Sequence, residues 1–134
     1  TFDIIFEQAQ PNFKRIFIYM AGYSDEDEFD EFIQRLDRLP DLAKKVTVPH
    51  LLVAGDMDEL CSPKDIEIFR SSLSGPSELW LYEGVFHPMG EVAEEIYPCI
   101  ADWLLETLNN GRSPNYTKNI YVEEGTVLAD YGHG

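Results

Sequence analysis

Apolar residues follow a strand-like pattern in two short stretches and a helical pattern after each of them. Residues 48–54 form a nearly continuous apolar run of strand length, typical of a parallel strand covered on both faces, and residues 78–82 give a second short strand. Between them, Ser62 and Pro63 mark a helix N-terminus, and the turn residues at 74–76 end that helix. Strand, helix, strand, helix predicts an α/β fold with parallel strands. The buried stripes of the two helices are expected to consist of Ile66, Ile68, Phe69 and Leu73, and of Ile96, Ile100, Trp103, Leu104 and Leu108.

The first 46 residues follow a helical pattern and are predicted to form cap or lid helices. Acidic residues crowd the first turns of a helix expected over 24–42, with Ser24 as its N-cap and Pro40 as the point where it ends or kinks. Residues 13–23 carry an apolar and aromatic face, which suits either ordinary packing or a cover over a substrate site. The apolar positions of the helix over 24–42 are Phe29, Phe32, Ile33, Leu36 and Leu39.

These patterns divide the chain into three predicted parts: cap helices at 1–46, an α/β segment at 47–111 and a C-terminal tail at 112–134. The tail holds one strand-like stretch at 116–122 and a glycine-rich end that we expect to be mobile. Two strands bury their faces poorly unless further strands lie beside them. We therefore expect a preceding N-terminal portion to supply the rest of the sheet, and the opening Thr1 in place of an initiator Met agrees with a piece of a longer protein.

The charge balance excludes several classes of partner. Lys and Arg number 10 against 25 Asp and Glu, a formal net charge of −15, which disfavours binding to nucleic acid or to an anionic membrane surface. No stretch approaches the roughly 18 consecutive apolar residues that a membrane span needs. Cys61 and Cys99 lack the pattern of a zinc site and are expected as reduced thiols, the simpler alternative to one disulfide. We expect a soluble, cytoplasmic protein.

An acid and a histidine follow the two predicted strands. Asp58 comes just after the break at Gly55, and His87 comes three residues after Gly84. The C-terminal ends of neighbouring parallel strands share one edge of a sheet, so the two side chains could meet there and act as a general base with its orienting carboxylate. Each residue taken alone also suits a simple turn or surface loop. Asp56 is the rival acid and is expected to cap the turn.

A metal site is not expected. A calcium loop built from Asp56, Asp58 and Glu59 lacks the glycine and the later glutamate of the EF-hand spacing. The remaining histidines have simple interpretations, because His50 lies inside the first predicted strand and His133 in the glycine-rich end.

The segment 48–58, the Ser-Pro helix start after it, the loop Glu83-Gly-Val-Phe-His87 and the helix 100–108 together resemble the last third of α/β-hydrolases. Within that superfamily the chain is most similar to the branch of FrsA-like esterases, dihydroxypseudooxynicotine hydrolase and the fungal pigment hydrolases that shorten polyketide chains. The stretch Phe29-Asp-Glu-Phe32 adds to the likeness, which covers roughly residues 25–110.

This resemblance implies that the chain is the C-terminal portion of an α/β-hydrolase fold and belongs to a serine hydrolase. It implies Asp58 as the triad acid and His87 as the triad base. It implies hydrolysis of an ester, or of a carbon–carbon bond next to a ketone, without a cofactor. We expect aromatic side chains to line the substrate pocket. The expected partners are a small-molecule substrate and the N-terminal part of the same protein, with a homodimer left open. The pocket residues that we predict are Phe17, Tyr19, Phe29 and Phe86.

The nucleophile of such an enzyme is missing from the chain. No Gly-x-Ser-x-Gly elbow occurs, so neither the reactive serine nor the oxyanion-hole donors around it can be assigned, and the fragment alone is expected to be inactive. Two alternatives stay open: a non-catalytic α/β binding or scaffold module, and a fragment of a prolyl-oligopeptidase-type peptidase. The serines that lack the elbow glycines are Ser24, Ser62, Ser71, Ser72, Ser74, Ser77 and Ser113.

Overall fold

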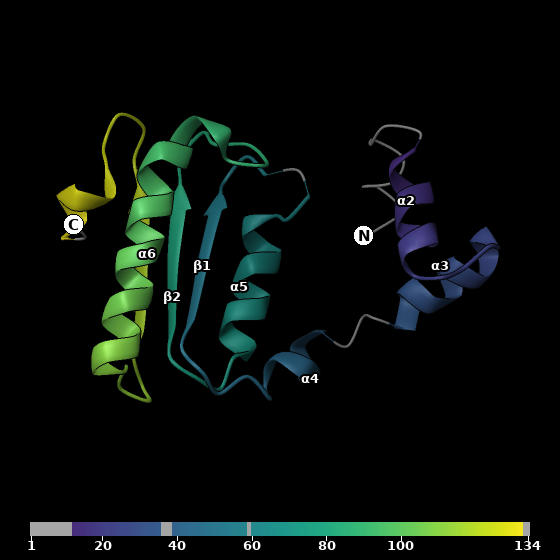
Figure 1. Ribbon diagram of the computed structural model, residues 1–134, viewed down its shortest axis with the longest axis horizontal. Coiled ribbons are helices and arrows are strands. Elements are labelled where there is room, and N and C mark those ends of the chain that lie inside the picture. The colour runs from purple at the N-terminus through teal and green to yellow at the C-terminus, as the bar shows by residue number, and fades with distance from the viewer. Residues whose placement is uncertain (1–11, 36–38, 59, 133–134) are drawn as a thin grey trace. The chain divides into compact units, whose positions relative to one another are not determined.

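The computed structural model describes residues 12–35, 39–58 and 60–132, and its internal contacts divide the chain into two compact units, 1–39 and 40–134 (Figure 1). Each unit has its own secondary structure. The smaller unit is helical, and the larger one contains a three-stranded parallel sheet with helices on both faces. The predicted α/β class is therefore confirmed.

The N-terminal unit contains helix α2 (Phe13–Met20) and helix α3 (Glu26–Arg35). Lys14 on α2 forms ion pairs with Glu26 at 2.7 Å and with Asp30 at 2.8 Å, both on α3. The helix N-cap is Asp25 and not the predicted Ser24, because the Asp25 carboxylate accepts the backbone N–H of Glu28 at 3.0 Å. An acidic side chain one residue later in the chain thus satisfies one of the free amides of the first turn of α3.

The single helix predicted over 24–42 is wrong. Helix α3 ends at Arg35, and a separate short helix, α4 (Leu39–Ala43), follows. Pro40 is the second residue of α4, where the missing N–H has no intrahelical partner to lose, so proline begins this helix and does not end the earlier one. Leu36 lies outside the described residues.

The sheet of the larger unit has the order β1 (His50–Gly55), β2 (Ser77–Tyr82) and β3 (Thr117–Val122), all parallel. Helix α5 (Pro63–Ser72) connects β1 to β2, and helix α6 (Ala93–Asn110) connects β2 to β3. The register aligns Gly55, Tyr82 and Val122, so all three strands finish at the same edge. The strand predicted in the tail is confirmed, and it extends the sheet beyond the two strands of the α/β segment.

Alternate residues of the strands face two different helices. On one face, Trp80 and Tyr82 of β2 pack with Ile120 and Val122 of β3 and with α6. On the other face, the strands pack against α5, and the contacts of that face are made by Ala54, Leu79 and Ile66 with Leu52 and Leu81 beside them. This period of two is the one expected of strands covered on both faces.

The last residues of the described chain pack against the core. A short 3-10 helix (Leu128–Tyr131) follows β3, and Leu128 in it is fully buried in the core on the α6 side. Glu95 of α6 accepts the Leu128 backbone N–H at 2.7 Å and the Tyr82 hydroxyl at 3.0 Å. An apolar side chain thus anchors 128–131, whereas 133 and 134, in the end predicted to be mobile, lie outside the described residues.

A carboxylate lies inside the core. Glu78 of β2 is fully buried and accepts hydrogen bonds from the indoles of Trp80 at 2.8 Å and Trp103 at 2.9 Å, and from the Tyr116 hydroxyl at 2.6 Å. Buried charge is tolerated when it is hydrogen-bonded in this way. The guanidinium of Arg112 lies over the rings of Trp103 and Tyr116, at 5.3 and 5.1 Å from their centroids, and adds positive charge to the cluster.

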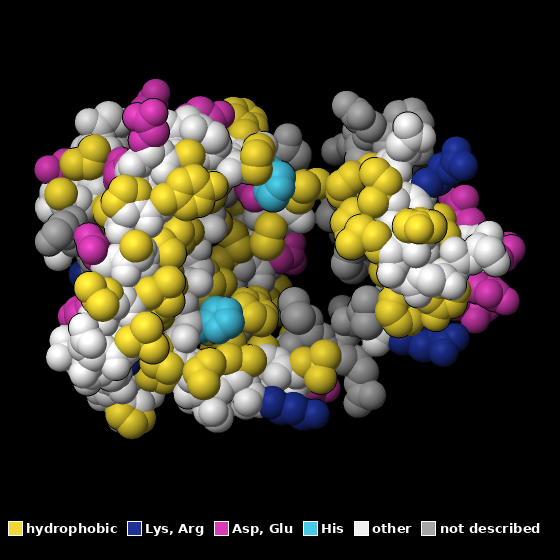
Figure 2. All heavy atoms as spheres, in the orientation of Figure 1, with side chains coloured by type: hydrophobic (Ala, Val, Ile, Leu, Met, Phe, Trp, Pro, Cys, Tyr) yellow, Lys and Arg dark blue, Asp and Glu magenta, His cyan; other side chains and the backbone are white. Residues whose placement is uncertain are grey.

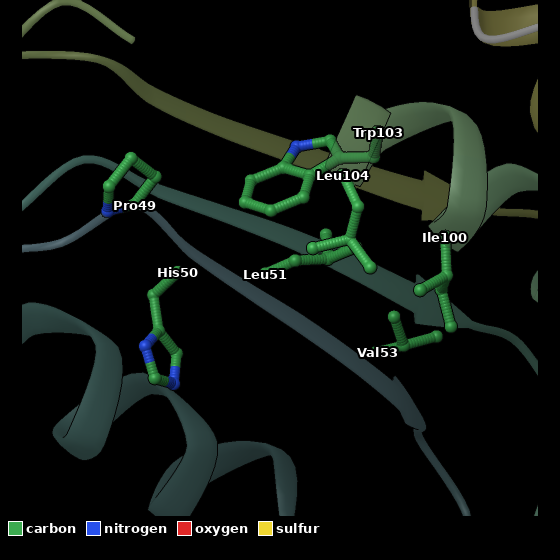
Figure 3. Close-up of a pocket in the computed structure, with 7 residues that line it drawn as sticks. All are labelled: Pro49, His50, Leu51, Val53, Ile100, Trp103 and Leu104. Carbon is green, nitrogen blue, oxygen red and sulfur yellow. The ribbon is translucent and has the colours of Figure 1, made fainter. Parts of the chain in front are cut away.

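Strand β1 is an edge strand, since no strand of the described chain pairs with its outer side. A shallow pocket lies where β1 meets α6 (Figure 3). Two residues predicted in the buried stripe of α6 are instead exposed, because they lie beyond the face that meets the sheet: Leu104 at the pocket and Leu108 near the helix end. Ile68 of α5 is exposed too. The residues that line the pocket are Pro49, His50, Leu51, Val53, Ile100, Trp103 and Leu104.

Hydrophobic side chains gather on the visible side of α6 (Figure 2). Several of them are large and exposed, which is unusual for a helix that belongs to a complete α/β layer. The exposed apolar residues of α6 are Tyr97, Leu104, Leu105 and Leu108.

Within the described ranges, no helix is both long enough and apolar enough to cross a membrane.

Candidate functional site

Asp58 is held in the turn after β1 by backbone hydrogen bonds. Its Oδ1 atom accepts the amide N–H of Leu60 at 2.8 Å and that of Cys61 at 3.0 Å, and its own N–H donates to the Gly55 carbonyl at 3.3 Å. Only 8% of the Asp58 side chain is exposed. The other oxygen, Oδ2, remains available for a partner from another part of the chain.

His87 is that partner. It lies in the loop after β2, and its Nδ1 atom is 3.1 Å from Oδ2 of Asp58. Because a carboxylate only accepts hydrogen bonds, Nδ1 carries the proton in this pair and donates it. The imidazole is 49% exposed, and no residue of the described chain hydrogen-bonds its Nε2 atom. The predicted acid and histidine are thus brought together, with the carboxylate buried and the imidazole open.

The loops that carry these two residues approach each other closely at Gly55. A Cβ atom on Gly55 would lie 2.0 Å from the carbonyl oxygen of Val85, so only glycine allows this contact. The Val85 carbonyl in turn accepts the Met57 N–H at 3.2 Å, and the Tyr82 carbonyl accepts the Asp56 N–H at 2.9 Å. The ladder between β1 and β2 therefore continues past the strand ends, up to the residues of the candidate site.

The His87 loop ends in a fixed turn. The Met89 N–H donates to the Phe86 carbonyl at 2.8 Å, and Met89 has a positive φ of 67° while its side chain is buried in the core. A left-handed conformation is uncommon for a residue other than glycine and persists only where the surroundings hold it. Burial of the Met89 side chain supplies that hold two residues after His87.

The Asp56 carboxylate binds two other segments of the chain and not the turn that it was predicted to cap. Its Oδ1 atom accepts the backbone N–H of Gly84 at 2.8 Å, and its Oδ2 atom accepts the Tyr121 hydroxyl at 2.9 Å. The hydrogen bond to Asp56 raises the pKa of Tyr121 to about 12. Tyr121 was not among the site residues predicted from the sequence. Its alternation with Ile120 and Val122 could have placed it on the other face of the strand, but not beside Asp56.

None of the serines of the described chain is hydrogen-bonded to His87. The Ser62 side chain caps α5, accepting the Asp65 N–H at 3.2 Å, which confirms the predicted cap. The hydroxyls of Ser71 and Ser72 donate to the Ile68 carbonyl, and that of Ser74 donates to the Lys44 carbonyl. These hydroxyls serve local backbone structure, so none of them is placed as a nucleophile.

Cys61 is the nucleophilic side chain nearest to Asp58 in the sequence. It is a free thiol, as is Cys99. Partial burial raises the pKa of the Cys61 thiol, and the carboxylates of Asp58 and Asp65 raise it further. A thiol with a raised pKa stays protonated at neutral pH and is a poor nucleophile.

The four predicted pocket residues lie in two places. Phe86 precedes His87 and is 46% exposed, so its ring is free to contact a ligand beside the imidazole. Phe17 and Tyr19 are exposed on α2 in the N-terminal unit, whereas Phe29 is almost fully buried there, with the rings of Tyr23 and Phe32 about 6 Å away. Because the Phe29 side chain is buried, almost none of its surface is available to contact a substrate. None of the four lines the pocket beside β1.

Within the described residues, no three histidine, cysteine or acidic side chains are grouped to hold a metal ion. The site presents an imidazole with one nitrogen hydrogen-bonded to a buried carboxylate and the other open to a hydroxyl or a water. Comparison of the chain with protein families, with curated proteins and with solved structures finds no match.

Proposed function

We propose that this chain is the C-terminal segment of an α/β-hydrolase, in which His87 and Asp58 activate a serine supplied by another segment of the protein. The observation that carries the proposal is the 3.1 Å contact between His87 Nδ1 and Asp58 Oδ2, made at the shared C-terminal edge of two parallel strands. The order of strand, acid, strand and histidine is that of the second half of the Ser-Asp-His triad.

His87 acts as general base and then as general acid. Its Nε2 atom takes the proton of the serine hydroxyl as the serine oxygen bonds to the substrate carbonyl carbon. The buried Asp58 carboxylate stabilises the imidazolium that forms. Nε2 then returns the proton to the leaving group as the carbonyl carbon releases it. A water molecule, activated in the same way, frees the acyl group from the serine.

The unpaired edge of β1 supports the proposal that the nucleophile lies in another segment of the protein. Strand β1 has apolar residues on both faces, as central parallel strands do, yet its outer side is unpaired within the described chain. Exposed edges are normally short, charged or covered. A further parallel strand beside β1 would remove this edge, and it would end at the same border as Asp58 and His87.

The substrate we propose is a small acyl compound, either an ester or a ketone whose neighbouring carbon–carbon bond is cleaved. The exposed Phe86 ring beside His87 supports an apolar or aromatic group next to the reacting carbonyl. The pair of Asp58 and His87 needs no cofactor for this chemistry.

The test is covalent labelling of the protein encoded by the full reading frame. A fluorophosphonate probe should modify one serine, located by mass spectrometry in a segment outside residues 1–134, and His87→Ala should reduce the labelling rate at least about a hundredfold. His50→Ala is the matched control and should label at the parent rate. Absence of a labelled serine, or equal labelling of His87→Ala and the parent, would contradict the proposal and favour a binding module.

A further inference from the structure

His87 depends on its loop for its position. Its side chain is half exposed, so packing alone does not fix the imidazole against Asp58. The loop is tied to the end of β1 by the hydrogen bond from Gly84 N–H to Asp56 Oδ1, at 2.8 Å. This bond lies three residues before His87 and two residues before Asp58, so it joins the two segments that carry the pair.

Asp56 is itself oriented by the last strand. Tyr121 of β3 donates its hydroxyl to Asp56 Oδ2 at 2.9 Å, so each oxygen of the Asp56 carboxylate has one donor. Strand β2 separates β3 from β1, and Leu81 of β2 pairs with Tyr121. The phenol therefore spans β2 to reach the end of β1. Through Asp56, one side chain links the C-terminal ends of all three strands.

We infer that Tyr121 is a positioning residue for His87 and acts through Asp56. With the hydroxyl in place, the carboxylate cannot rotate away from Gly84 without losing a charge-assisted hydrogen bond. Without it, the His87 loop keeps its backbone contacts to β1 but loses the group that fixes the direction of Asp56. This role rests on the proposed function, since a position for His87 matters most where His87 transfers a proton. It also makes the strand after α6 part of the site.

The test follows the imidazole of His87 and needs no substrate. Long-range proton–nitrogen NMR spectra of the 134-residue chain at about pH 9, where a free imidazole is neutral, distinguish a ring protonated at Nδ1 from one protonated at Nε2. The His87 signals are assigned by their loss in His87→Gln. In the parent, the Nδ1–H form should dominate because Asp58 accepts that proton.

Tyr121→Phe and Asp56→Asn should each lower the ratio of the Nδ1–H to the Nε2–H form about two- to tenfold, the effect of weakening one hydrogen bond. Tyr131→Phe is the matched control. Its hydroxyl binds Glu123 N–H and Thr126 in the same C-terminal region, so its loss disturbs the tail without touching Asp56. The ratio in Tyr131→Phe should equal that of the parent.

A second readout verifies the contact itself. In Asp56→Asn, the pKa of Tyr121, raised to about 12 by this hydrogen bond, should fall toward the usual value of about 10 in an ultraviolet titration. Folded Tyr121→Phe and Asp56→Asn variants with the parent tautomer ratio would overturn the inference, as would an equal change in Tyr131→Phe. A changed ratio in a protein that no fluorophosphonate labels would keep the positioning role and reject the hydrolase.

Discussion

The carboxylates of Asp56 and Asp58, two residues apart after β1, bind different parts of the His87 loop. Asp58 Oδ2 accepts a hydrogen bond from His87 Nδ1 at 3.1 Å, whereas Asp56 Oδ1 accepts one from the backbone N–H of Gly84 at 2.8 Å. One carboxylate thus orients a side chain and the other holds the backbone that carries it. This division explains why the turn contains two acids although the proposed proton transfer uses only one.

Gly55→Ala should destabilise the larger unit by about 1–3 kcal/mol, because the added methyl group meets the Val85 carbonyl and one backbone must shift. Urea unfolding followed by tryptophan fluorescence measures this, since Trp80 and Trp103 both lie in that unit. Gly90→Ala is the control. Apart from its chain neighbours, no atom of the described residues lies within 4 Å of its added Cβ, so the stability of this variant should stay close to that of the parent. Equal stability of all three proteins would contradict the close approach of the two loops.

Leu128→Ala should cost about 2–5 kcal/mol of unfolding free energy, the usual loss for a fully buried leucine. The neighbouring Val127 is 44% exposed, so Val127→Ala should cost much less. The same urea titration compares the two variants. Similar small losses in both would mean that the chain after β3 does not pack against α6.

Glu78→Gln should lower the unfolding free energy by about 1.5–3 kcal/mol, although the side chain keeps its shape. The amide nitrogen cannot accept, so at least one of the donors Trp80, Trp103 and Tyr116 loses its acceptor in the core. Glu124→Gln changes an exposed glutamate after β3 and should leave stability nearly unchanged. An unchanged unfolding free energy in Glu78→Gln would show that the buried carboxylate is dispensable for stability.

Stability should fall as the pH rises from about 10 to 12. Burial, with the hydrogen bond to Glu78, raises the pKa of Tyr116 to about 12, so the folded state keeps a phenol proton that the unfolded state has lost. Burial raises the pKa of Tyr82 as well and adds to the same decline. In Tyr116→Phe the decline should be shallower, as measured by urea midpoints across this range. Parallel curves for the variant and the parent would contradict the assignment.

The sequence predicted the parts of the fold that depend on local pattern. The apolar runs at β1 and β2 and the Ser62 cap of α5 were readable because strand burial and capping leave short signals. The meeting of Asp58 and His87 followed from one general property, the common edge at which neighbouring parallel strands end. Their separation of 29 positions in the sequence did not matter to that argument.

The parts that escaped prediction depend on which segments become neighbours. Tyr121 reaches Asp56 across 65 residues because β3 pairs with β2, and no periodicity encodes the order of strands. Glu78 is the first residue of the predicted strand 78–82, and its donors Trp103 and Tyr116 come from a later helix and loop. Such polar contacts depend on tertiary packing, so the sequence pattern of a single element does not predict them.

The most direct test of the proposed triad is a double-mutant cycle on ester hydrolysis by the protein encoded by the full reading frame. His87→Ala and Asp58→Asn should each lower kcat/KM about 10³–10⁴-fold, and the double variant should be no slower than His87→Ala, because Asp58 acts only through the imidazole. A His87→Ala protein that hydrolyses the ester at the parent rate would contradict this account. So would losses from the two substitutions that simply multiply in the double variant.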